Sequence, residues 1–312
     1  MTKHIPVLMQ IAIHYAMDMS GEKPILVDCT LGGGGYSQKI LDKNDKVVLY
    51  SFDLDRLATD KYVSNLKKIG YHIISSKDNQ TYLQKEDREN IVITDNFSNF
   101  ERHLKAEVVQ RIDAVIADLG WSTDQLETIE GLSYEREDAE LDMRYSKEVN
   151  HVKASDLLNV LDSGGMETLF TSYGELGYKK AKNLTQKIIK VRQKNSIKTV
   201  GDFLNILKAL HLDSQKIKSQ AFQALRIAVN NEYEAITELV KSAYTNLRKG
   251  GRLIIVTFHS GEDKILLDAV SEINGFDQKT LDGKPFGRPS VQELKNNLSA
   301  RSAKLFVFEK NE

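Results

Sequence analysis

Short apolar runs alternate with helical patterns over residues 1–120, and this alternation restricts the fold of the chain more than any other feature of its sequence. The runs are "PILVDC", "KVVLYSFD", "NIVITDNF" and "RIDAVIADLG", and helices are expected to begin near Ser37 and Arg56. Continuous apolar strands separated by helices are typical of a parallel sheet with both faces covered. We therefore predict an α/β fold with a Rossmann-like doubly wound sheet.

A helical segment interrupts the strands. Short amphipathic patterns replace the apolar runs over residues 126–211, and a long helical stretch, residues 219–247, then leads to the strands "RLIIVTF" and "AKLFVFEK". We predict that an all-helical domain, residues 126–215, is inserted into one sheet domain formed by residues 1–125 and 216–312.

Composition narrows the cellular setting and the kinds of partner. Charged residues make up 28% of the 312 residues but nearly cancel, so a polyanion would have to be held by local basic patches. The single cysteine, Cys29, excludes an internal disulfide framework, and no apolar run reaches the length of a membrane span. The histidines and the cysteine form no ligand-spaced cluster, so we expect no metal site. We expect a cytoplasmic protein without a membrane partner.

Four consecutive glycines, Gly32–Gly35, follow the first predicted strand in "VDCTLGGGGYSQKIL". In a doubly wound sheet this loop lies where ligands bind, and glycine lets the backbone come close to them. A dinucleotide fingerprint would need a further glycine where Ser37 or Gln38 stands, and a P-loop would need a lysine after the glycines. S-adenosylmethionine remains, with Asp53 after the second strand as the acceptor for its ribose hydroxyls. The alternative is that the glycines only form a tight turn and that Asp53 is a solvated acid.

Asp118 ends the fourth predicted strand, and Trp121 follows it closely. Methyl transfer to an exocyclic ring amine needs acceptors that hold the N–H bonds while the nitrogen becomes more tetrahedral, and Asp118 can act in this way. Trp121 can stack on a displaced base, or it can pack the insert onto the sheet. Cys29 is predicted to be a small buried residue rather than the nucleophile that methylation of a pyrimidine carbon commonly uses. A nitrogen or another heteroatom is therefore favoured as the methyl acceptor.

Ordered sequence blocks along nearly the whole chain resemble those of one known family. The blocks are "HIPVLM", "DCTLGGGGYS", "DLGWSTDQLE", "LDMR", "SYGEL", "AFQALRIAVNNE", "GGRLIIVTFHSGEDK" and "RSAKL". They are similar to blocks of the bacterial small-subunit ribosomal RNA cytosine-N4 methyltransferase family, RsmH, also called MraW. So many blocks in the same order are far more specific than any one of them.

The resemblance implies a class I S-adenosylmethionine-dependent methyltransferase sheet with a helical domain inserted after the fourth strand. It implies methyl transfer to N4 of a cytidine in the decoding region of small-subunit (16S) ribosomal RNA, which leaves S-adenosylhomocysteine. Gly32 belongs to the cofactor loop, and the family's cofactor contacts fall on Gly34, Gly35, Tyr36, Asp53, Phe97, Asp118 and Gln125. Phe97 can flank the adenine, while Asp118 or Gln125 receives polar groups of the cofactor.

Several positions around the expected target pocket depart from the family pattern. Tyr36 replaces the usual histidine, Trp121, Thr123 and Asp124 replace Val, Ser and Pro of the next block, and "EGLSY" and "FHSGEDK" also differ. These changes mark a divergent orthologue, a paralogue with a different RNA target, or weakened activity. Two further alternatives stay open. One is a non-catalytic RNA- or ribosome-binding paralogue that still binds the cofactor, and the other is a small-molecule methyltransferase.

Polar residues outside the glycine loop are further candidates. His259 in "FHSGEDK" follows the fifth strand and is either a catalytic base or a structural hydrogen-bonding residue, positioned by Glu262 and Asp263. Asp142 and Arg144 can form an ion pair that orders a loop over the pocket, or Arg144 can contact phosphate.

The most basic part of the insert is "ELGYKKAKNLTQKIIKVRQK", which has six lysines and one arginine against one glutamate. If it is helical, it forms either an RNA-binding surface or an ordinary solvated helix. We predict small-subunit ribosomal RNA as the partner, with contacts from Lys179, Lys182, Lys190, Arg192 and Arg144. A homodimer is compatible with the sequence.

Overall fold

The computed structural model describes residues 6–18, 21–120 and 129–312, apart from the side chains of residues 298 and 299. The chain divides into two compact units. The first combines Met1–Gly120 with Glu234–Glu312, and the second is Trp121–Tyr233.

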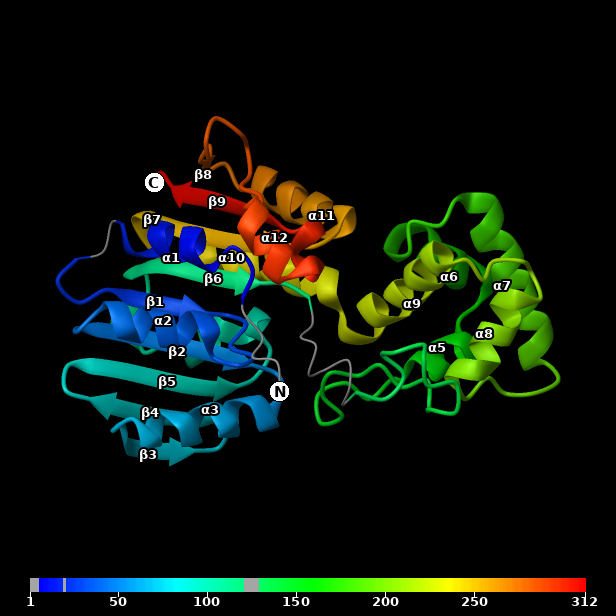
Figure 1. Ribbon diagram of the computed structural model, residues 1–312, viewed down its shortest axis with the longest axis horizontal. Helices are drawn as coiled ribbons and strands as arrows, with labels where there is room; N and C mark the ends of the chain where they lie inside the picture. Colours follow the sequence, from blue (N-terminus) through cyan, green and yellow to red (C-terminus); the bar gives the residue numbers. More distant parts are fainter. Residues whose placement is uncertain (1–5, 19–20, 121–128) are drawn as a thin grey trace. The chain divides into compact units, whose positions relative to one another are not determined.

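The sheet of the first unit places its described strands in the order β3-β4-β5-β2-β1-β6-β7-β9-β8 (Figure 1). Their bounds are β1 (Ile25–Asp28), β2 (Val47–Asp53), β3 (His72–Lys77), β4 (Gln80–Lys85), β5 (Arg88–Thr94), β6 (Ile112–Asp118), β7 (Leu247–Thr257), β8 (Phe276–Gln278) and β9 (Lys304–Lys310). The central strands β5, β2, β1, β6 and β7 run parallel, and β9 is antiparallel to β7 and β8. The chain order reverses at β1, between β2 and β6, which confirms the predicted doubly wound sheet.

The hairpin of β3 and β4 has no counterpart among the predicted strands. Two-residue turns, Asp78–Asn79 and Glu86–Asp87, join β3 to β4 and β4 to β5. Connections of this length are the commonest in hairpins, so the Asp-Asn pair was a usable signal in the sequence. The strand β3 is exposed along its whole length, and for that reason it lacks a clear buried face in its sequence pattern.

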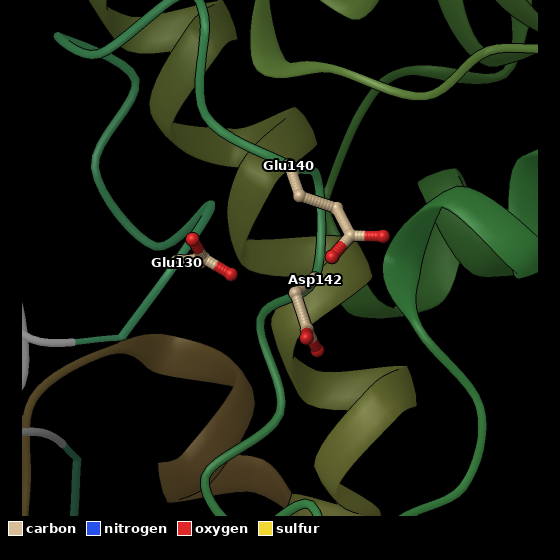
Figure 2. Close-up of side chains that lie close together, drawn as sticks. All are labelled: Glu130, Glu140 and Asp142. Atoms are coloured by element: carbon tan, nitrogen blue, oxygen red, sulfur yellow. The ribbon is translucent and has the colours of Figure 1, made fainter.

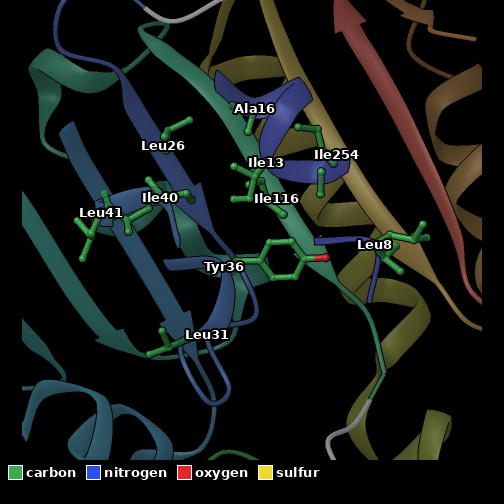
Figure 3. Close-up of a cluster of buried hydrophobic side chains, with 14 of the residues drawn as sticks. Leu8, Ile13, Ala16, Leu26, Leu31, Tyr36, Ile40, Leu41, Ile116 and Ile254 are labelled. Atoms are coloured by element: carbon green, nitrogen blue, oxygen red, sulfur yellow. The ribbon is translucent and has the colours of Figure 1, made fainter. Parts of the chain in front are cut away.

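Three helices, α1 (Met9–Met17), α2 (Gly35–Lys43) and α3 (Arg56–Lys68), pack into one apolar cluster with the sheet. Figure 3 shows part of this cluster, in which Ile13 and Ile40 from the helices meet Leu26 and Ile116 from β1 and β6. Successive strand residues point to opposite faces, and runs of consecutive residues are buried in β1, β2, β6 and β7, so these strands are covered on both sides. The remaining elements of this unit are η1 (Phe97–His103), η2 (Ala106–Val108), α10 (Glu232–Asn246), which begins at the boundary of the unit, α11 (Ser260–Ser271), α12 (Val291–Asn296) and η4 (Leu298–Ser302).

The regular elements of the second unit that the structure describes are helices, as predicted for the insert, and residues 129–153 before them form turns and loops. It contains α5 (Ala154–Val160), α6 (Ser163–Thr168), η3 (Leu169–Tyr173), α7 (Tyr178–Arg192), α8 (Val200–Lys208) and α9 (Gln215–Asn230). No helix in the described ranges combines the length and the apolar character that crossing a bilayer requires.

The boundary of the second unit differs from the predicted insert, residues 126–215, because α9 belongs to it. This helix packs Phe222 and Leu225 into the apolar cluster of the insert. Asn231, with a left-handed φ of 50°, then separates α9 from α10 (Glu232–Asn246), so the predicted helical stretch is two helices. Asparagine tolerates this conformation better than most residues, and it ends a helix for that reason.

Candidate functional site

Three carboxyl groups end neighbouring strands of the sheet. Asp28, Asp53 and Asp118 are the last residues of β1, β2 and β6. Because β1 pairs in parallel with both other strands, the three ends share the edge at which the strand order reverses. Asp53 and Asp118 are predicted site residues, whereas Asp28 is not. The sequence signal that could have identified Asp28 is an acid at the end of the first strand, shortly before the glycine loop.

The glycine loop is pinned to the end of β2 through Asp53. The Gly32 N–H donates to Asp53 Oδ2 at 2.6 Å, and the Asp55 N–H donates to Oδ1 at 2.9 Å. Each carboxylate oxygen can accept more than one hydrogen bond, so the fixed carboxylate keeps acceptor capacity for a ligand. This arrangement suits the predicted contact with ribose hydroxyls.

The glycines differ in what surrounds them. A Cβ at Gly34, where φ is 83°, would lie 2.4 Å from the Tyr62 ring, and one at Gly35 would lie 2.2 Å from Pro6. At Gly33 a Cβ would meet nothing within 4 Å, so this position faces open space. The helix α2 begins here without a side-chain cap, which leaves its first N–H groups available to an anionic ligand group.

Asp28 is fully buried beneath the loop. Its carboxylate accepts a hydrogen bond from Ser37 Oγ at 2.6 Å and another from the Thr30 N–H at 3.1 Å. Ser37 also contacts Ser51 Oγ at 2.8 Å, and Asn90 donates to Ser51 at 2.9 Å. This network joins β1, α2, β2 and β5, so Asp28 holds the loop in place from below.

The electrostatics of the three strand ends favour a cation. Burial raises the pKa of Asp28 and of Asp53 to about 6, against hydrogen bonds that lower both values. Burial raises the pKa of Asp118 well above its ordinary value, and the charges of Asp28 and Glu262 raise it further. Burial and mutual repulsion disfavour the ionised forms of these neighbouring acids, and a positive charge placed among them would stabilise those ionised forms. The site therefore fits S-adenosylmethionine, with its positive sulfonium and amino groups, better than a phosphate ligand.

Asp118 offers an acceptor to a ligand. Its Oδ1 is buried and has no hydrogen-bond partner among the residues that the structure describes. The backbone around it is held firmly, since the Asp118 N–H donates to Thr30 Oγ1 at 2.7 Å and the Leu119 N–H donates to the Val256 carbonyl at 3.0 Å. A buried polar atom without a partner costs about 1–3 kcal/mol, which an N–H group of a ligand would offset.

Phe97 begins η1 directly after β5. The preceding loop is tied to β2, because the Asp95 N–H donates to the Asp53 carbonyl at 3.0 Å. The Asp95 carboxylate also pairs with His103 Nε2 at 2.7 Å, which closes η1 on itself. Phe97 is half-buried at the end of the strand next to β2, where the predicted adenine contact requires it.

The side chain of Tyr36 does not have the predicted role. It is 2% exposed, and its hydroxyl donates to the Val7 carbonyl at 2.6 Å in the protein interior. Only the backbone of Tyr36 is left for a cofactor contact. The predicted residues Trp121 and Gln125 lie outside the described residues.

His259 caps α11 at the end of β7. Its Nδ1 accepts a hydrogen bond from the Glu262 N–H at 3.3 Å, and Glu262 Oε2 accepts one from the Phe258 N–H at 2.6 Å. Asp263 pairs with Lys304. A reciprocal capping box of this kind supports the structural alternative for His259, with Glu262 positioning it.

In the second unit the expected ion pair is present. Arg144 donates from Nε to Asp142 Oδ1 at 2.6 Å and from Nη2 to Oδ2 at 2.9 Å, and its Nη1 donates to the Asn150 carbonyl at 3.2 Å. Burial acts to raise the pKa of Asp142, but the hydrogen bonds from Arg144 outweigh it, so the pKa lies below its ordinary value. Arg144 is occupied by these partners, which argues against its predicted phosphate contact.

Glu130, Glu140 and Asp142 bring carboxylate oxygens within 4.8 Å of one another (Figure 2). Lys153 pairs with Glu140 at 2.6 Å, and Lys147 lies 3.7 Å from both other acids. With the guanidinium group at Asp142, three cations balance three acids. The cluster is therefore an ion-pair network rather than a site that needs a metal ion.

Helix α7 carries its lysines on one side. Ala181, Leu184, Thr185 and Ile188 form its buried face. The opposite side is exposed or half-buried and has no acidic residue; it contains Lys179, Lys180, Lys182, Lys187 and Lys190, with Lys194 just beyond the helix. None of these lysines forms an ion pair with a described residue. The predicted basic surface is thus a single face of α7.

Arg192 does not belong to that face. Its Nη1 donates to the Leu158 carbonyl at 2.9 Å and to the Leu161 carbonyl at 2.7 Å, at the end of α5. It satisfies carbonyl groups that a helix end leaves free, so its role is structural rather than the predicted RNA contact. Arg192 lies four residues after the buried Ile188, and this spacing in the sequence indicates that both side chains lie on the same face of α7.

Cys29 is 1% exposed. Burial raises the pKa of its thiol well above the ordinary value, and the charge of Asp28 raises it further. A neutral buried thiol is a poor nucleophile, which confirms the prediction of a small structural residue.

Comparisons with known proteins identify the family of the chain. A family model described as the MraW methylase family matches residues 1–311. Proteins named ribosomal RNA small subunit methyltransferase H are similar along their whole length. The one from Phocaeicola vulgatus is 34% identical and the alignment covers 98% of this chain and 97% of that protein, and the one from Mycoplasma capricolum subsp. capricolum is 33% identical with 100% of both covered. Among solved structures, an rRNA methylase from Streptococcus thermophilus has a TM-score of 0.42 at 15% identity and covers 100% of this chain and 99% of that chain. Matched from end to end by the family model and by these relatives, the chain is a methyltransferase and belongs to the MraW methylase family.

Proposed function

We propose that the protein transfers a methyl group from S-adenosylmethionine to N4 of a cytidine in the decoding region of 16S ribosomal RNA. The observation that carries the proposal is the buried Oδ1 of Asp118, an acceptor without a partner in the described part of the chain, at the edge where the glycine loop lies. Membership of a methylase family supports the chemistry. The name of the relatives, ribosomal RNA small subunit methyltransferase H, supports the RNA.

The cofactor-binding half of the site is made by the ends of β1, β2 and β5. Bound S-adenosylmethionine supplies an electrophilic methyl group on a positively charged sulfur. Asp53 would accept the ribose hydroxyls, Phe97 would flank the adenine, and Gly33 with the start of α2 would meet the amino-acid end. Gln125 remains a proposed contact. The three acids also favour release of S-adenosylhomocysteine, because it lacks the sulfonium charge.

Asp118 would hold the cytosine amine. Asp118 Oδ1 would accept a hydrogen bond from an N–H group of the amine. This bond restrains the nitrogen and turns the nitrogen lone pair from the ring toward the methyl group. The amine does not have to lose a proton before the attack. Afterwards the nitrogen carries an additional proton, and the raised pKa of Asp118 suits its carboxylate to accept it. Trp121 would stack on the displaced base, and His259 would stabilise the neighbouring turn.

Transfer of a labelled methyl group to small ribosomal subunits that lack the decoding-region N4 methyl group tests the function. Nucleoside analysis of the product should show N4-methylcytidine. Cofactor binding without any RNA product would favour the non-catalytic paralogue, and methylation of another nucleotide would favour a different RNA target. Turnover without RNA would favour a small-molecule methyltransferase.

The exposed face of α7 is the proposed RNA contact, through Lys179, Lys182 and Lys190. Reversing these three charges to glutamate should weaken RNA binding and flatten its dependence on salt. Each phosphate contact with single-stranded nucleic acid contributes about 0.7 to the slope of log K against log salt, so the slope should fall by about 2. Fluorescence anisotropy with a labelled RNA at several salt concentrations measures it.

The matched control reverses the same number of charges on α3, at Lys61, Lys67 and Lys68, which are exposed in the first unit. This control should leave the salt slope unchanged. Both variants should bind S-adenosylmethionine like the wild type. An unchanged slope in the α7 variant would show that RNA binds elsewhere.

The cellular location and the oligomeric state of the protein are not tested by the structure, and they remain predictions from the sequence. We propose a cytoplasmic location, which rests on the composition of the chain, and the sequence is also compatible with a homodimer. Sedimentation of the protein at several concentrations tests the dimer.

A further inference from the structure

The segment between β8 and β9, residues 284–304, carries an excess of positive charge. Its single acid is Glu293, against five basic residues, which are Lys284, Arg288, Lys295, Arg301 and Lys304. The acid is already engaged, since Glu293 Oε1 accepts a hydrogen bond from the Leu8 N–H at 2.6 Å. In a chain whose total charge is only -1, this excess makes the segment a local basic surface.

Four of the five basic side chains have no acidic partner. Lys304 pairs with Asp263. The others are exposed, and none of them forms an ion pair within the described parts of the chain; they are Lys284, Arg288, Lys295 and Arg301. The Arg288 guanidinium is nevertheless held, because it lies 5.2 Å from the centre of the Phe286 ring, which packs against Phe306 at a centroid distance of 5.6 Å. A cation held on an aromatic ring loses less conformational freedom when it binds an anion.

The segment lies at the edge of the sheet where Asp118 ends β6. Because β9 is antiparallel to β7, its first residue, Lys304, stands opposite the last residue of β7. Gly287 exchanges hydrogen bonds with Leu305 at 2.9 and 3.0 Å, which brings the neighbouring Arg288 to the same edge. Figure 1 shows that β6 and β9 run in opposite directions, with α12 at the end of the sheet to which β6 points.

Side chains of the same segment anchor it in the apolar cluster of the first unit. Ala300 and Ala303 are fully buried, and Leu294 packs against the cluster from α12. Lys295 and Arg301 directly follow two of these anchors in the chain. The basic side chains are therefore carried by a backbone that is fixed to the sheet, as a surface that positions a ligand requires.

We propose that Lys284, Arg288, Lys295 and Arg301 form a second RNA-binding surface, which holds phosphate groups of the nucleotides next to the target cytidine. The proposal rests on the proposed function, because a displaced base whose amine reaches Asp118 leaves its flanking backbone at this edge of the sheet. Phosphate contacts position a nucleic acid without reading its sequence. This surface would thus set the register of the strand in the first unit, in addition to the face of α7 in the second.

Neutralising three of these cations tests the surface. In the variant Arg288→Gln/Lys295→Gln/Arg301→Gln, the slope of log K against log salt should fall by about 2, since each contact with a single-strand phosphate contributes about 0.7. Affinity at about 0.1 M salt should accordingly fall about 100-fold. Fluorescence anisotropy with a labelled single-stranded RNA measures both quantities. The Kd for S-adenosylmethionine should be that of the wild type, which shows that the variant is folded.

The matched control neutralises three exposed cations near the amino ends of β2, β6 and β7, at the opposite edge of the sheet: Lys46, Arg111 and Lys249. It should keep the wild-type slope. So should the charge-preserving variant Arg288→Lys/Lys295→Arg/Arg301→Lys, because charge sets the salt dependence. An unchanged slope in the glutamine variant, an equal fall in the control, or a fall in the charge-preserving variant would overturn the proposal.

Two further outcomes keep the assignment specific. Loss of binding to phosphatidylglycerol vesicles in the glutamine variant, with RNA binding unchanged, would assign the surface to a membrane and overturn the proposal. RNA binding and methyl transfer are measured separately, so the proposed function can fail by itself. If the wild type forms no N4-methylcytidine but the salt slope falls in the glutamine variant, the proposed function fails and the RNA-binding surface stands.

Discussion

Asp118→Asn is expected to slow methyl transfer to RNA about 10²–10³-fold, the loss that follows removal of one preorganised polar group from a transition state. The amide places an N–H donor toward the amine and cannot take its proton. The Kd for S-adenosylmethionine should change less than ten-fold, because the carboxylate acts mainly on the acceptor. Single-turnover rates with saturating cofactor, together with calorimetric binding, measure the two effects separately.

The outcome also decides whether Asp118 acts on the cofactor or on the cytosine amine. Equal losses of rate and cofactor affinity would place the carboxylate on the cofactor rather than on the cytosine amine. An unchanged rate would remove Asp118 from the mechanism. Asp55→Asn serves as the control, since it makes the same change of charge at an exposed helix cap.

Asp53→Asn is expected to weaken S-adenosylmethionine binding about 10–100-fold. Hydrogen bonds to a charged acceptor contribute about 1.5–3 kcal/mol, and each 1.4 kcal/mol corresponds to about ten-fold in affinity. Because the pKa of Asp53 lies at about 6 in the folded protein, the wild-type affinity should rise about ten-fold between pH 5 and pH 7.5 as the carboxylate ionises. The variant should show a flatter dependence, which the remaining buried acids Asp28 and Asp118 produce.

As the pH rises, the free energy of unfolding of the wild type should fall, whereas its affinity for S-adenosylmethionine rises. The folded-state pKa of Asp53 is raised from 3.8 to about 6, so its contribution to stability is present at low pH and is lost as the pH rises through about 6. Asparagine does not ionise, and the variant should therefore gain about 1 kcal/mol relative to the wild type between pH 5 and pH 7.5. Urea unfolding of the cofactor-free proteins at both pH values measures this difference.

The control for this variant is again Asp55→Asn. It keeps an acceptor for the Leu57 N–H, so the cap of α3 is preserved. It should bind the cofactor like the wild type, with a small downward shift of the pH midpoint, because the Asp55 charge is a minor influence on Asp53. Wild-type affinity in Asp53→Asn would place the ribose acceptor elsewhere.

Features that depend on neighbours in the chain could be predicted from the sequence. The apolar runs predicted β1, β2 and β6, and the acids at two of their ends predicted Asp53 and Asp118 as site residues. The glycines after β1 predicted a close approach of backbone to a ligand, and Gly33 keeps that space open. The sequence predicted a lysine-rich helix at α7, but the gathering of its lysines opposite a buried face is seen only in the structure.

Contacts between distant segments could not be predicted in the same way. Tyr36 meets Val7 across 29 positions, and Leu8 meets Glu293 across 285. Arg192 has the charge of an RNA contact, but it caps α5 because two carbonyl groups from another helix end lie beside it. No local pattern encodes these partners.

The sequence by itself determined the parallel strands, the glycine loop and the acidic strand ends, because strand periodicity and turn chemistry depend on residues that are adjacent in the chain. The tertiary structure alone decided which side chains face a ligand and how readily the three acids ionise. Burial and hydrogen-bond partners set both properties, and they exist only after distant segments have packed together.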